Sequence, residues 1–180
     1  MATEEWGLQM SLALKAVRAM HVDSSRLLLD LDRTLVGYTS VYRSVATIDS
    51  MSYDIKKPDF MTDGVFRHWV HPSQADTVIA VNLAFWDDNV DLKEPFFIAA
   101  KIRYAEPLPN PWDRNKAWDP WHAYLSWTNP REVDLLSEAK PPEDRADILR
   151  AVSVGTPLSR IATEASGARF LNLVKSFNFV

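Results

Sequence analysis

The stretch TVIAVNLAFWDDNVDLKEPFFIAAKIRYA, residues 77–105, decides the fold because it holds two runs rich in β-branched and aromatic residues. Runs of this composition are typical of β-strands. The acidic segment DDNVDLKE between them is too short for the helix that connects parallel strands. The sequence therefore predicts an antiparallel hairpin with a long acidic loop.

Alternation along the two runs predicts which side chains share a face of the sheet. One set in each run is apolar, and we expect both sets to pack on the N-terminal helices: Ile79, Val81, Leu83, Phe85, Phe96, Ile98, Ala100, Ile102 and Tyr104. The opposite set is small or cationic: Ala80, Asn82, Ala84, Ala99, Lys101 and Arg103. This second set indicates a groove for a small anionic ligand or a partner's acidic loop, with an ordinary solvent-facing sheet as the alternative.

Helical spacing marks the N-terminal segments. Residues 3–20 have the pattern of an amphipathic helix with four apolar residues on one face, Trp6, Met10, Leu14 and Val17. Apolar residues that recur at spacings of three and four predict a second helix over residues 24–48. The same positions suggest a homodimer seam through residues 24–48.

The remaining elements complete an α+β prediction. We expect strands at 65–71 and 122–128, a short helix at 142–152, and a final helix from Pro157 towards Phe177. The predicted fold is a single α+β domain over residues 1–180. It has two N-terminal helices packed on a mostly antiparallel sheet of four to five strands, a Pro/Trp-rich wrap and a C-terminal helix.

The wrap is the segment with the most unusual composition. Residues 106–142 hold seven of the eleven prolines and four of the seven tryptophans, which favours an ordered irregular segment over a linker. Aromatic and arginine residues on a proline-stiffened loop are typical of a binding hot spot. Tryptophans can equally cap the open end of a core. The candidate contact residues are Trp112, Arg114, Trp118, Trp121 and His122, together with Lys101 and Arg103 of the hairpin.

Composition excludes several classes of protein. The formal charge of −4 argues against a general nucleic-acid-binding surface, which needs clustered basic residues. The absence of cysteine excludes disulfides, thiolate nucleophiles and cysteine-based metal sites. The N-terminus is acidic where a secretory signal is basic, and the longest apolar run is half a membrane span. We expect a cytoplasmic protein that binds neither nucleic acid nor membrane.

The segment LLLDLDRTLV, residues 27–36, carries the strongest catalytic pattern. It resembles the first signature of the haloacid dehalogenase-like phosphohydrolases, in which an apolar strand runs into Asp-x-Asp-x-Thr. The resemblance implies Asp30 as the nucleophile and Asp32 as the acid/base, with both helping to hold magnesium. Beyond this segment, the chain lacks the alternating strands and helices of that fold. On a strand the two carboxylates can point the same way, whereas on a helix they lie about 200° apart.

His68 and His71 have the spacing of a helical metal site, but a strand places them on opposite faces. We therefore expect no metal and no cofactor. The preferred function is a non-enzymatic cytoplasmic protein that binds an unknown protein partner or a small anionic ligand. The alternative is a magnesium-dependent phosphohydrolase that uses Asp30 and Asp32.

Overall fold

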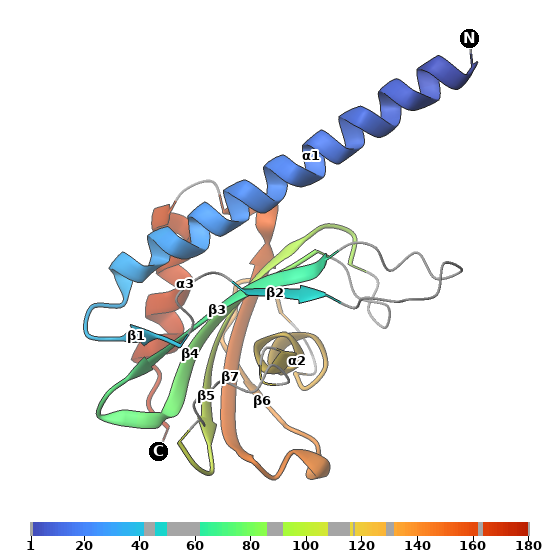
Figure 1. The fold of residues 1–180 in the computed structure, drawn as a ribbon. Helices are drawn as coiled ribbons and strands as arrows, with labels where there is room; N and C mark the ends of the chain where they lie inside the picture. Colours follow the sequence, from blue (N-terminus) through green and yellow to red (C-terminus); the bar gives the residue numbers. More distant parts are fainter. Residues whose placement is uncertain are drawn as a thin grey trace.

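An antiparallel sheet forms the middle layer of the fold and carries helices on both faces (Figure 1). The computed structural model describes residues 2–41, 46–49, 62–85, 92–107, 116, 118–128, 132–161 and 164–179. The α+β class predicted from the sequence is confirmed, whereas the number of helices and strands differs from the prediction.

Seven strands within the described residues form the sheet, in the order β1-β3-β4-β5-β7-β6, and β2 also pairs with β3. Each of these strand pairs is antiparallel. The bounds are β1 (Thr39–Ser40), β2 (Ala46–Asp49), β3 (Thr62–His71), β4 (Gln74–Ala84), β5 (Phe96–Tyr104), β6 (Ser137–Ala139) and β7 (Ile148–Pro157). The predicted hairpin is confirmed as β4 and β5, two central strands of the sheet.

Register decides what each face of the hairpin carries. Ile79 pairs with Lys101 and Leu83 pairs with Phe97, so the apolar set of β4 shares its face with the cations of β5. The expectation that the alternating apolar set of β5 packs on the N-terminal helices was wrong, because these residues lie on the other face: Phe96, Ile98, Ala100, Ile102 and Tyr104. The small residues of β4 and the cations of β5 are therefore on opposite faces and do not form one groove.

One face of the sheet packs against the end of α1 (Ala2–Asp30), the 3-10 helix η1 (Leu31–Thr34) and α3 (Glu164–Ser176). A single apolar cluster joins these helices to β3, β4 and β5. Its fully or almost fully buried members include Leu28, Leu31, Leu35, Trp69, Ile79, Val81, Leu83, Phe97, Leu171 and Val174. This cluster is the largest of the three apolar clusters found among the described residues.

The other face of the sheet is covered by α2 (Asp119–Leu125), a helix of the Pro/Trp-rich wrap. Trp121 and Tyr124 of α2 are buried against the strands. Gly155 of β7 permits the contact, because a Cβ added there would lie 2.3 Å from the Tyr124 ring. The lack of a side chain at Gly155 therefore allows α2 to lie close to β7.

Three predicted elements are corrected by the structure. Residues 122–128, expected as a strand, belong largely to α2. The helix expected at 142–152 is replaced by the short 3-10 helix η3 (Glu143–Arg145) and by β7, which runs to Pro157. The final helix therefore starts later, at Glu164, after the 3-10 helix η4 (Leu158–Arg160).

The N-terminal region also differs from the two predicted helices. α1 runs without a break to Asp30, and η1 then leads into a turn at Gly37. Gly37 has φ +86°, a backbone conformation that glycine adopts without a steric penalty. The chain enters the sheet at Thr39, so residues 24–48 are not one helix.

Candidate functional site and binding surfaces

The first turns of α1 project past the sheet, and every residue from Trp6 to Ala16 is exposed (Figure 1). We call this segment the α1 arm. At 1.5 Å per residue its eleven residues extend about 16 Å. Five large apolar side chains are more than half exposed on the arm: Trp6 69%, Leu8 62%, Met10 54%, Leu12 56% and Leu14 65%. The expected packing of this helix on the sheet is therefore found only in its later turns.

The apolar residues of the arm lie on two sides of the helix. Trp6, Met10 and Leu14 follow one another at intervals of four, and this stripe continues through Val17 to the buried side chains of Ser24 and Leu28. Leu8 and Leu12 lie roughly on the opposite side, since two residues along a helix are separated by about 200°. The apolar stripe that is buried at Leu28 therefore continues along the α1 arm, where it is exposed.

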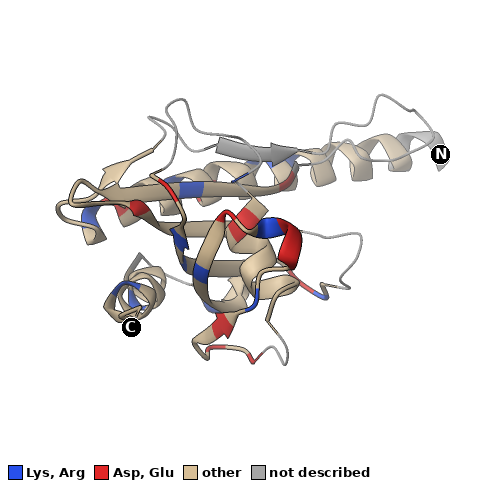
Figure 2. Ribbon diagram, turned by 90° about the horizontal axis from the view of Figure 1, so that it is seen from below, with Lys and Arg blue, Asp and Glu red and all other residues tan. Residues whose placement is uncertain are grey.

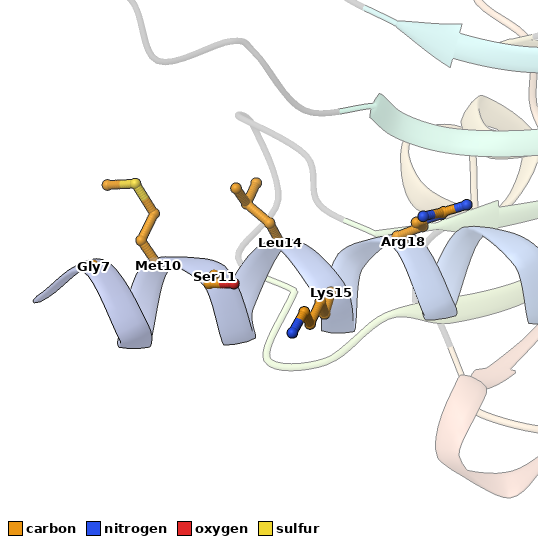
Figure 3. Close-up of a pocket in the computed structure, with 6 residues that line it drawn as sticks. All are labelled: Gly7, Met10, Ser11, Leu14, Lys15 and Arg18. Atoms are coloured by element: carbon orange, nitrogen blue, oxygen red, sulfur yellow. The ribbon is translucent and has the colours of Figure 1, made fainter. Parts of the chain in front are cut away.

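A shallow depression of about 410 Å³, lined by α1 alone and largely open to solvent, runs along the arm (Figure 3). Its lining includes Met10, Leu14, Lys15 and Arg18. Met10, Leu14 and Arg18 project to one side of the helix, and Lys15 projects to the other. The arm therefore presents a mixed surface in which apolar side chains are bordered by two cations.

The aromatic residues of the wrap form a stack on α2. The rings of Trp118 and His122 have centroids 6.2 Å apart, and the His122 and Trp127 centroids are 5.6 Å apart with an interplanar angle of 23°. Arg145 lies over the Trp127 ring at 5.4 Å. All four residues are half-buried. The ring faces are thus largely occupied by one another.

Trp121 belongs to the core rather than to this surface, since it is only 1% exposed. Trp112 and Arg114 lie outside the described residues. Trp127 is the member of the aromatic stack that the sequence-based candidate list left out. The sequence did not indicate that Trp127 lies beside His122, because residues 122–128 were predicted to form a strand. In the structure, α2 and the turn after it bring the two rings together.

A buried ionic network fixes the wrap to the sheet. Asp119 is completely buried and accepts hydrogen bonds from Tyr104 at 2.7 Å and from both Nη atoms of Arg145 at 2.7 and 2.9 Å. Arg145 also pairs with Asp147, which in turn accepts from Lys116. Burial, followed by the charge of Asp119, holds the pKa of Tyr104 well above its ordinary value. The network stabilises the wrap and offers no open site.

A second hollow, of about 190 Å³, lies between the strand ends and the segment after α3. We call it the C-terminal hollow. Its polar lining residues are Gln74, Asp76, Thr77, Lys101, Arg103 and Asn178. The two cations that the sequence nominated in the hairpin, Lys101 and Arg103, are therefore brought together here, on the face that also carries α3.

The two cations of this hollow differ in their surroundings. Lys101 is 8% exposed and donates to the carbonyl oxygens of Lys175 and Phe177 at 3.2 and 2.8 Å. Burial lowers the pKa of Lys101. Arg103 is 47% exposed at its side chain and donates through Nε to Asp76 at 3.1 Å. Lys101 thus helps to end α3, while Arg103 is open to solvent.

The aspartate pair does not adopt the arrangement that phosphoryl transfer requires. Asp30 is the last residue of α1 and Asp32 lies in η1, so neither stands on a strand. Asp30 lies 3.7 Å from Arg33, whereas Asp32 accepts from Arg67 at 2.7 and 2.5 Å and from Trp69 at 2.7 Å. The carboxylates are therefore engaged by different partners.

The electrostatics of Asp32 are those of a structural ion pair. Burial alone raises the pKa of Asp32, but hydrogen bonds from Arg67 and Trp69 and the charge of Arg67 outweigh this effect and lower it. Arg67 is 3% exposed and needs a counter-charge. Asp32 is thus a partner for a buried arginine.

The described residues contain no group of three or more His, Asp or Glu side chains placed to hold a metal ion. His68 and His71 do not converge, since His68 is buried on the α2 face and His71 approaches Tyr38 and Ser73. Among the helices that the structure describes, none is long and apolar enough to cross a membrane. Comparison with protein-family models, curated proteins and solved structures finds no match to this chain.

Proposed function

We propose that this chain is a non-enzymatic binding protein whose α1 arm docks against another protein. The observation that carries the proposal is the exposure of five large apolar side chains on the α1 arm, which do not belong to the apolar clusters of the described residues. Single exposed apolar residues are common on monomeric proteins, but several gathered on one helical segment mark an interaction site. The aspartates of residues 27–36 have structural partners and do not support the enzymatic alternative.

The magnitude of the available burial agrees with this proposal. Fully burying a side chain such as Leu or Met contributes about 1.5–3 kcal/mol. Five side chains that are roughly 60% exposed therefore offer on the order of 5–9 kcal/mol. Association itself costs about 4–15 kcal/mol. A partner that encloses both sides of the arm buries all five side chains, whereas a partner on one side buries only two or three of them.

A helix that carries apolar residues on two sides fits a groove better than a flat surface. The binding mode that we propose is therefore insertion of the α1 arm into a groove of the partner protein. A homodimer is a special case, although the seam predicted within residues 24–48 is not available for it, since Leu28, Leu31 and Leu35 are buried in the chain's own core. Any self-association would instead involve the arm.

The aromatic stack on α2 is a weaker candidate for partner contact, because its ring faces already contact one another and Arg145. We also propose that the protein is cytoplasmic. The lack of cysteine supports this location, because it fits a reducing compartment.

Photo-crosslinking tests the docking proposal. A photoreactive phenylalanine analogue at Met10 or Leu12 should give a discrete adduct in cells that produce the protein, and the same analogue at Glu143, an exposed residue of η3, should not. An adduct of twice the chain mass identifies a second copy, and any other discrete mass identifies a different partner. Equal labelling at Met10 and Glu143 would show that the arm has no specific partner.

A further inference from the structure

The C-terminal hollow gathers more positive than negative charge. Lys101 and Arg103 of β5 lie on the same face as Arg150 of β7, and Arg103 and Arg150 are directly opposite one another in register. Asp76 pairs with Arg103 and Glu138 pairs with Arg150. Among the described residues that line the hollow, the two cations Lys101 and Arg103 stand against one carboxylate, Asp76, which leaves one positive charge. Like charges directly opposite each other in a sheet are destabilising, and a bound anion would offset that cost.

Lys101 and Arg103 have more N–H donors than the hydrogen bonds that they make to neighbouring residues. An ammonium has three N–H donors, and Lys101 gives two of them to the carbonyls that end α3. A guanidinium has five, and Arg103 gives its Nε–H to Asp76. Gln74 and Asn178, whose amides also carry N–H donors, line the same hollow. Four donor-bearing side chains from three segments therefore line one hollow.

An aromatic wall shields the cations on one side. The Phe179 ring lies 5.5 Å from the Lys101 ammonium and 5.5 Å from the Arg150 guanidinium. An aromatic face attracts both cations and keeps them at the edge of the hollow without neutralising their charge. Phe179 thereby holds the C-terminal segment over the strand ends.

The size of the hollow restricts the ligand. Its volume of about 190 Å³ is below the roughly 300–1,000 Å³ of pockets that enclose a whole organic ligand. It matches a single oxyanion group, for which paired Arg and Lys donors are the usual recognition chemistry. Basic and acidic positions are interspersed over the described ribbon, so this excess of charge is local (Figure 2).

We propose that the C-terminal hollow is a binding site for a small oxyanion, a phosphate or carboxylate group held between Arg103 and Lys101. The ligand is either a free anion or the terminal group of a larger molecule whose remainder lies outside the hollow. The proposal is independent of the α1 arm, which lies at the opposite end of the chain.

Titration with inorganic phosphate tests the site, with binding followed by calorimetry and by amide NMR shifts of β4, β5 and the C-terminal segment. We expect saturable binding with a Kd of about 1 mM, at constant ionic strength set with sodium chloride. Arg103→Gln should weaken binding at least tenfold. Asp76→Asn, which removes a competing carboxylate, should strengthen it severalfold. Lys101 is left intact because it supports the end of α3.

Arg33→Gln is the matched control, since the Arg33 side chain is 76% exposed and its one ion pair among the described residues is with Asp30 at 3.7 Å. It should leave the affinity for phosphate unchanged. Parallel titrations with glycerol phosphate and acetate identify the source and chemistry of the oxyanion: equal affinity for both phosphates supports a terminal phosphate group, and tighter acetate binding supports a carboxylate. Shifts that do not saturate, or that are the same in Arg103→Gln, would overturn the proposal.

Discussion

At the scale of single residues, the structure gives the two aspartates of LLLDLDRTLV different tasks. Asp32 neutralises the buried Arg67 and accepts from the Trp69 indole, while Asp30 makes only an exposed contact with Arg33. The local sequence matches a phosphate-transfer signature in every required position. The pairing with Arg67, thirty-five residues later, could not be read from that match.

Asp32→Asn should therefore destabilise the fold more than Asp30→Asn. The change keeps the shape of the side chain but leaves the charge of Arg67 buried and unpaired, at a cost of about 2 kcal/mol, less than the ~3–5 kcal/mol of fully buried pairs because Asp32 is partly exposed. Asp30→Asn should cost less than about 0.5 kcal/mol. Urea denaturation measures both values, and equal losses would contradict the assigned roles.

His68 makes stability depend on pH. The residue is 1% exposed on the α2 face, and burial lowers its pKa from 6.5 to about 3. The unfolded chain binds a proton below pH 6.5, whereas the folded chain resists protonation until about pH 3. Stability contributed by neutral His68 is thus complete above pH 6.5 and is lost as the pH falls towards 3.

We expect the free energy of unfolding to fall by about 2 kcal/mol between pH 7 and pH 5, at about 1.4 kcal/mol per pH unit below 6.5. His68→Gln should remove most of this slope, even if it lowers stability at pH 7. Denaturant titrations at pH 7, 6 and 5 measure the slope in both proteins. A slope that is the same in the variant would assign the pH dependence to other groups.

At the scale of elements, α1 divides into a packed half and an exposed half. The division follows from position and not from composition, since both halves carry the same apolar stripe. Helical periodicity predicted which residues share a face. It could not predict that the N-terminal turns of α1 extend past the sheet (Figure 1).

This division predicts opposite effects for two leucines of the same helix. Leu28→Ala should destabilise the fold by about 2–5 kcal/mol, because Leu28 is completely buried in the main core cluster. Leu12→Ala should change the free energy of unfolding by less than about 0.5 kcal/mol, because Leu12 is 56% exposed. Thermal or urea unfolding of the two variants measures the difference. A loss above 1 kcal/mol for Leu12→Ala would mean that the arm packs within the chain.

Two other elements show why sequence patterns failed. β7 is buried on both faces over most of its length, so it lacks the alternation of a half-exposed strand and was expected as a helix and a helix start. The start of α2 can be recognised in the sequence, because Asp119 is followed by Pro120, an arrangement that favours the first turn of a helix.

At the scale of the whole molecule, the sequence by itself determined the α+β class, the antiparallel hairpin of residues 77–105 and the helical N-terminus, because these depend on local composition and periodicity. Tertiary structure alone decided the pairing of Ile79 with Lys101, the placing of β7 beside β5, the engagement of Asp32 by Arg67, and the exposure of the α1 arm. Each of these is a contact, or the absence of one, between segments far apart in the chain. A one-residue change of register moves a side chain to the other face of the sheet, so local patterns cannot fix such contacts.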